Sequence, residues 1–109
     1  MNGIKCITYT NNDSKFVIDF TSLTVLDNDI LLPINKKLAS HYLQLLLSIT
    51  DEWEDEYIDR TLTDGDLWNF VITYQNGKEK KYIGRSSYPY NFDAFLDLNR
   101  EIINEVYYV

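Results

Sequence analysis

The feature that most constrains the fold is a helical repeat of apolar residues that begins after Asn35. The repeat runs mostly in steps of three and four and comprises Leu38, Tyr42, Leu45, Leu46, Ile49, Trp53 and Tyr57. Such spacing places side chains on one face of an α-helix, and Asn35 is a suitable N-cap. The pattern predicts helix over 36–59, either as one helix or as two with a kink at 48–51. In the second case Thr50 or Asp51 would cap the new helix, and Asp51 would form a capping box with Glu54.

Two runs rich in β-branched and aromatic residues, 4–9 and 15–20, flank the turn-forming residues 11–14. This pattern predicts a hairpin. Residues 23–26 predict a further strand or a continuation of the second one. Pro33 lacks a backbone N–H group, so the apolar residues before it are not expected to form a central strand.

A second hairpin is predicted around Asn76-Gly77, because both residues tolerate the positive φ angles of a two-residue turn. Residues 67–74 alternate between apolar and polar side chains before this turn, and residues 78–83 return after it. A two-residue turn would place Val71 opposite Tyr82.

A final helix is predicted after Asn91, which is its expected cap, with an apolar face formed by Phe92, Phe95, Leu96, Ile102, Ile103 and Val106. The resulting order is β-β-(β)-α-β-β-α. It predicts an α+β fold in which two helices pack on one face of an antiparallel sheet of four to five strands. The length of 109 residues suits a single domain spanning 1–109.

The negative charge is concentrated in residues 51–66, which we call the acidic segment. It contains one base, Arg60, and eight acids: Asp51, Glu52, Glu54, Asp55, Glu56, Asp59, Asp64 and Asp66. The formal net charge of the chain is −7, and elsewhere its acids and bases balance. On a helix, residues 51–59 would carry about one charge per 2 Å, close to the roughly 1.7 Å of B-DNA. We therefore expect an outward-facing surface that binds a basic, nucleic-acid-binding protein, unless lysines of the second hairpin neutralise it.

Other chemistry finds little support in the sequence. A calcium loop placed on Gly65 lacks acidic ligands at its first, third and twelfth positions, while Cys6 and His41 are the only residues of their types. We therefore expect no metal, no cofactor and no enzyme activity, although a small carboxylate or metal-dependent enzyme is a weighed alternative. A sequence pI of about 4.5 disfavours direct nucleic-acid binding. Without a membrane-length apolar run or a secretory pattern, the expected location is the cytoplasm of the bacterial or host cell.

The carboxylate-rich run 51–59, in a small acidic chain with nine tyrosines, resembles phage-type inhibitors of host defence nucleases, including anti-CRISPR proteins. It is similarly like bacterial immunity proteins that neutralise a nuclease toxin. The resemblance implies a stoichiometric inhibitor whose partner is basic. Tyr88 and Tyr90 are candidate aromatic anchors for that partner. A plain interaction module, including a homodimer formed through the apolar C-terminus or the second hairpin, is the further alternative.

Overall fold

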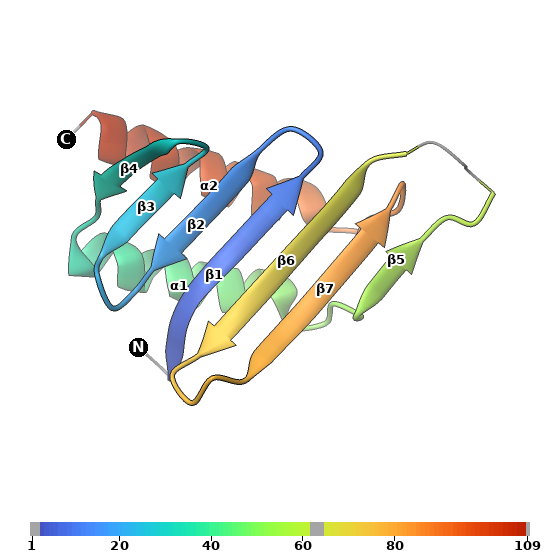
Figure 1. Ribbon diagram of the computed structural model, residues 1–109, viewed down its shortest axis with the longest axis horizontal. Helices are drawn as coiled ribbons and strands as arrows, with labels where there is room; N and C mark the ends of the chain where they lie inside the picture. The colour runs from blue at the N-terminus through green and yellow to red at the C-terminus, as the bar shows by residue number, and fades with distance from the viewer. Residues whose placement is uncertain (1–2, 62–64, 109) are drawn as a thin grey trace.

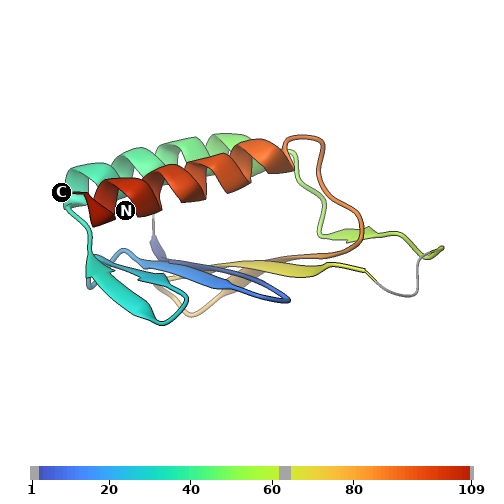
Figure 2. The same ribbon diagram turned by 90° about the horizontal axis from the view of Figure 1, so that it is seen from above.

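A computed structural model describes residues 3–61 and 65–108 and shows a seven-stranded sheet with both helices on one face (Figures 1 and 2). The strands are β1 (Ile4–Asn11), β2 (Lys15–Asp19), β3 (Thr24–Asp27), β4 (Ile30–Pro33), β5 (Glu56–Ile58), β6 (Leu67–Tyr74) and β7 (Glu79–Arg85). The helices are α1 (Lys36–Thr50) and α2 (Phe92–Tyr107). The predicted α+β class, with both helices on one face, is confirmed.

The strand order is β4-β3-β2-β1-β6-β7-β5, and every neighbouring pair is antiparallel except β5 and β7, which are parallel. The sheet therefore has seven strands where four to five were predicted. The additional strands are β4 and β5, which are short and form its two edges (Figure 1). The position of Pro33 at the end of an edge strand agrees with its missing N–H group.

The predicted hairpin of β6 and β7 is present, but its register differs by one residue. Phe70 lies opposite Tyr82, and Val71 lies opposite Lys81. The reason is a three-residue turn: the Tyr74 N–H donates to the carbonyl of Lys78 at 2.8 Å. Gly77 takes the left-handed position of this turn, with φ of 87°. A glycine there is typical of three-residue hairpin loops.

This register places Tyr82 on the same face as Phe70, and the two rings stack with centroids 5.9 Å apart. It also places Gly84 opposite Trp68. A Cβ atom at position 84 would overlap the Trp68 indole, so the missing side chain makes room for that ring. The one-residue shift thus keeps the aromatic residues of both strands under the helices.

The predicted helix does not extend through the acidic segment, because α1 ends at Thr50 with Asp51 as its C-cap. Asp51 therefore does not start a second helix. The Trp53 N–H donates to the carbonyl of Thr50 at 3.1 Å, which turns the chain back toward the sheet. Trp53 is buried beneath the helices, and the chain then enters the edge strand β5. Trp53, which was predicted to lie on the buried face of a helix, is thus buried because the chain turns after α1.

The core lies between the sheet and the helix pair and is rich in aromatic rings, including Tyr42, Trp53, Trp68, Phe70 and Phe95. Asn91 precedes α2 as predicted, although its side chain makes no capping hydrogen bond to the helix. In the described residues, neither helix is of a length and hydropathy that would let it cross a membrane.

Candidate functional site

The described part of the acidic segment lies at the outer edge of the sheet and includes the edge strand β5 (Figure 1). Seven of its eight carboxylates belong to described residues, and Asp64 lies outside them. Asp59 is half-exposed, and the exposed residues are Asp51, Glu52, Glu54, Asp55, Glu56 and Asp66. The predicted outward display therefore holds for the described carboxylates, but on a turn, a loop and a strand instead of a helix.

The backbone of this segment is held by a hydrogen-bonded contact that we call the Asn91 clasp. The Trp53 Nε1–H donates to Asn91 Oδ1 at 2.7 Å, and Asn91 Nδ2 donates to the carbonyl of Ile49 at 2.8 Å. One amide side chain thus joins the end of α1 to the residue that follows the turn. The Trp53 ring also makes an edge contact with Tyr82, with centroids 5.5 Å apart. Neighbouring carboxylates are therefore carried by a fixed backbone.

The strand β5 fixes the other half of the acidic segment. It pairs with the end of β7, where the Ile83 N–H donates to the carbonyl of Asp55 at 2.9 Å and the Asp59 N–H donates to that of Arg85 at 3.0 Å. Tyr57 turns inward, and its Oη accepts the backbone N–H of Glu54 at 2.8 Å. These hydrogen bonds hold the backbone around β5 against the sheet, and its acidic side chains remain accessible to solvent.

No ion pair within the described ranges 3–61 and 65–108 neutralises the acidic segment; the two pairs found there are Lys81–Glu79 and Arg100–Asp97. The lysines of the second hairpin therefore leave its described carboxylates unpaired. At Asp59, hydrogen bonds from the Thr61 side chain and backbone lower the pKa of the carboxyl group, which favours its charged form. Asp51 stands at the C-terminus of α1, whose last turn has no base. Negative charge is unfavourable at that end of a helix dipole.

The comparison with the charge spacing of DNA needs correction. It assumed a helical rise of about 1.5 Å per residue, whereas β5 rises by roughly 3.3 Å per residue. The chain also bends at Trp53 before it reaches that strand. The described carboxylates therefore form a patch that is less dense than a continuous helical row.

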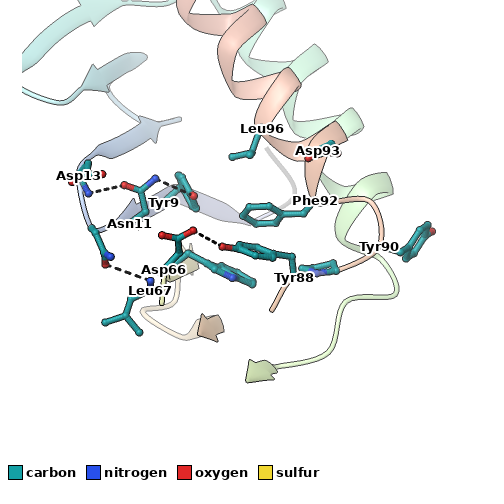
Figure 3. A pocket seen from close by; sticks show the side chains of 13 residues that line it. Tyr9, Asn11, Asp13, Asp66, Leu67, Tyr88, Tyr90, Phe92, Asp93 and Leu96 are labelled. Carbon is teal, nitrogen blue, oxygen red and sulfur yellow. Dashed lines mark hydrogen bonds between the residues drawn. The ribbon is translucent and has the colours of Figure 1, made fainter. Parts of the chain in front are cut away.

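A pocket of about 510 Å³ lies beside the acidic segment, between the β1–β2 turn, the start of β6 and the start of α2 (Figure 3). Its lining comprises Tyr9, Asn11, Asn12, Asp13, Asp66, Leu67, Trp68, Tyr88, Pro89, Tyr90, Phe92, Asp93 and Leu96. Among the described residues, Asp66 belongs both to the pocket lining and to the acidic segment. The volume falls in the usual range for ligand pockets, roughly 300–1,000 Å³.

One predicted anchor, Tyr88, forms a wall of the pocket. Its hydroxyl donates to Asp66 Oδ2 at 2.9 Å, and its ring stacks on Trp68 with centroids 6.4 Å apart (Figure 3). Burial, the hydrogen bond to Asp66 and the charge of that residue raise the pKa of the Tyr88 hydroxyl. Tyr90, the other predicted anchor, is 85% exposed and stands at the rim. The structure therefore brings Tyr88 and Asp66 together.

The pocket itself was not predicted, because its wall is assembled from three parts of the chain that are distant in sequence, 9–13, 66–68 and 88–96. Alternation along β6 does indicate that Trp68 faces inward, but no local pattern places it beside Tyr88 or Tyr9. Within the part of the chain that the structure describes, no group of three or more histidine, cysteine, aspartate or glutamate side chains could hold a metal ion. His41 is exposed on α1.

Comparison of the chain with models of known protein families, with curated proteins and with solved structures finds no match.

Proposed function

We propose that this chain is a non-enzymatic inhibitor whose acidic segment docks on the basic, nucleic-acid-binding surface of a partner protein, such as a defence nuclease. The observation that carries this proposal is the exposure of the described carboxylates of 51–66, with no internal ion pair reaching them in the residues described. Occupation of the partner's nucleic-acid groove would block its substrate. The partner of a bacterial immunity protein, a nuclease toxin, would present the same chemistry.

Two physical features support a recognition role for this charge. Concentrated charge raises the rate of encounter with an oppositely charged surface, most strongly at low ionic strength. The Asn91 clasp and the β5–β7 pairing fix the backbone beforehand, so less conformational entropy is lost on binding. The corrected spacing favours a patch that meets several cationic side chains over a continuous imitation of a duplex.

The test compares two variants that remove the same amount of charge from different places. One carries Asp51→Asn, Asp55→Asn and Asp59→Asn. The control carries Asp29→Asn together with the substitutions Glu101→Gln and Glu105→Gln on α2, all at exposed positions outside the acidic segment. Each protein, including the wild type, is used as bait in a cell lysate at low salt, and bound proteins are released by a salt step.

Each captured basic protein is then purified and loaded with a fluorescent oligonucleotide, whose displacement is followed by anisotropy. We expect the wild type and the control to displace the oligonucleotide, and the acidic-segment variant to do so at least about tenfold less well, with a strong dependence on salt. Equal displacement by both variants would exclude the acidic segment as the working surface.

An assembly module is the second candidate, and one observation favours it. At the opposite edge of the sheet, Ile30 and Leu31 of β4 are 50% and 62% exposed. Exposed apolar edge strands pair readily with other chains. Light scattering at micromolar concentration tests this alternative: a dimer lost on Leu31→Lys supports it, and a wild-type monomer contradicts it.

A further inference from the structure

The charged side chains that line the pocket beside the acidic segment are all negative. Among the described residues, three carboxylates contribute to its lining, those of Asp13, Asp66 and Asp93, and no lysine, arginine or histidine does. All three residues are exposed to water. Such a lining repels anions and attracts a cation.

The hydrogen bonds of the wall favour a ligand that donates. Asn11 Nδ2 donates one of its two N–H groups to the Tyr9 hydroxyl at 3.3 Å, and the Tyr88 hydroxyl donates to Asp66 Oδ2 at 2.9 Å. The other oxygen of Asp66 accepts no hydrogen bond from the described residues, and neither do the carboxylates of Asp13 and Asp93. The wall therefore offers charged acceptors to a ligand rich in N–H groups.

The apolar part of the wall is aromatic. Tyr88 is 40% exposed and contacts Phe92 with ring centroids 5.0 Å apart, while Phe92 packs on Trp68 at 4.9 Å (Figure 3). Aromatic faces attract cations, and a planar guanidinium also stacks on them. Tyr88 places such a ring directly beside the carboxylate of Asp66.

We propose that this pocket receives an arginine side chain of the partner protein, with the guanidinium against Asp66 and Tyr88. Arginine fits better than lysine, because its planar fork can donate two hydrogen bonds to one carboxylate while its face lies on an aromatic ring. The assignment rests on the proposed function, since it supplies that basic partner with a defined anchor. Asp66 links the two surfaces, because it belongs both to the acidic segment and to the pocket.

The experiment needs no knowledge of the partner. The full chain, labelled with ¹⁵N, is titrated with Nα-acetyl-arginine methylamide, the corresponding lysine compound and the citrulline compound, which is a neutral analogue of arginine. The Trp68 indole N–H, which donates to the carbonyl of Ser87 at 3.0 Å, reports on the pocket. The Asn76 amide in the β6–β7 turn reports on effects elsewhere, because this turn lies outside the pocket lining.

We expect saturable shifts at Trp68 with the arginine compound, and binding at least about tenfold weaker with citrulline because the charge-assisted hydrogen bonds are lost. Asp66→Asn should weaken arginine binding by about tenfold while its amide oxygen still accepts from Tyr88. Asp29→Asn, in the turn between β3 and β4, removes the same charge outside the pocket and should leave the affinity unchanged.

Three results would overturn the proposal: shifts that do not saturate or that are equal at Asn76, equal binding of citrulline, or equal loss of affinity in the Asp29 and Asp66 variants. Tighter binding of the lysine compound would reject arginine as the occupant. The proposed function is tested separately, because the Asp51, Asp55 and Asp59 variant leaves every lining residue intact. If the pocket binds the arginine compound while the Asp51, Asp55 and Asp59 variant displaces the oligonucleotide as well as the wild type does, the pocket proposal stands and the proposed function fails.

Discussion

The Asn91 clasp offers the sharpest test of how the acidic segment is held, through the substitution Asn91→Ala. This change removes the acceptor of the Trp53 indole N–H at 2.7 Å and the donor to the Ile49 carbonyl at 2.8 Å. Trp53 is only 6% exposed, so water cannot readily replace its lost partner. An unpaired buried polar group costs about 1–3 kcal/mol. Ile49 is half-buried and its carbonyl loses a donor as well, so we expect a total loss of about 2–4 kcal/mol in the free energy of unfolding.

The assay is urea unfolding followed by tryptophan fluorescence and far-UV circular dichroism, together with thermal unfolding. For a domain of this size, the expected loss corresponds to a fall in Tm of about 10–20 °C. Asn104→Ala removes an exposed amide from α2 and is the matched control, with an expected change within about 0.5 kcal/mol. Amide hydrogen exchange should also accelerate at residues 51–55 in the Asn91 variant, because the clasp fixes their backbone.

A double-mutant cycle with Trp53→Phe measures how much of the loss in the free energy of unfolding comes from the hydrogen bond between Trp53 and Asn91. The two single losses should not add, because both variants break the same hydrogen bond. An Asn91→Ala protein within about 0.5 kcal/mol of the wild type would refute the view that this amide holds the end of α1 to Trp53 and stabilises the backbone there.

Three further changes test the electrostatics and the buried polar contacts. Asp51→Lys should raise the free energy of unfolding by about 0.3–1 kcal/mol by complementing the C-terminus of α1, and reduced stability in urea would contradict this reading. The hydrogen bond from the Ser22 backbone N–H is the main cause that lowers the pKa of the Asp19 carboxyl group in the folded protein. The stabilisation from the charged carboxylate is therefore present above pH 3.8 and is lost as the pH falls through the lower folded-state pKa. In urea unfolding, Asp19→Ala should be less stable than the wild type at pH 7 and should match it well below pH 3.8, and a difference that does not depend on pH would count against this linkage. Tyr42→Phe leaves the buried Asn99 Oδ1 without its 2.7 Å donor and should lose about 1–3 kcal/mol in urea unfolding. Adding Asn99→Leu should recover that loss by removing the unpaired amide, and a further loss would contradict the explanation.

Local patterns predicted much of the fold because their causes are local. Alternating apolar residues around turn-forming sequences produced both hairpins, and the apolar stripe after Asn91 produced α2. The hairpin register was predicted one residue out, because Asn76-Gly77 suits both two-residue and three-residue turns. The tertiary choice buries Tyr82 and aligns Gly84 with Trp68, a difference in packing that the turn sequence does not contain.

The candidate site divides in the same way. The clustered acids and the two tyrosines that flank Pro89 are visible in the sequence, but the contact between Asp66 and Tyr88 joins residues 22 positions apart. The pocket around them requires the β1–β2 turn, β6 and α2 to meet. Sequence spacing carries no information about that meeting.

The amino-acid sequence by itself determined that the surplus negative charge lies in residues 51–66 and that the rest of the chain is balanced. It also determined the class of the fold, through periods of two and of three to four residues. Only the tertiary structure decided that Trp53 leaves the helix for an aromatic core and that β5 joins the sheet beside β7. A continued helix and a turn after α1 would both bury Trp53, so the apolar pattern does not distinguish between them. The contacts that stabilise the turn come from residues far away in the sequence, above all Asn91, and form only when the chain folds.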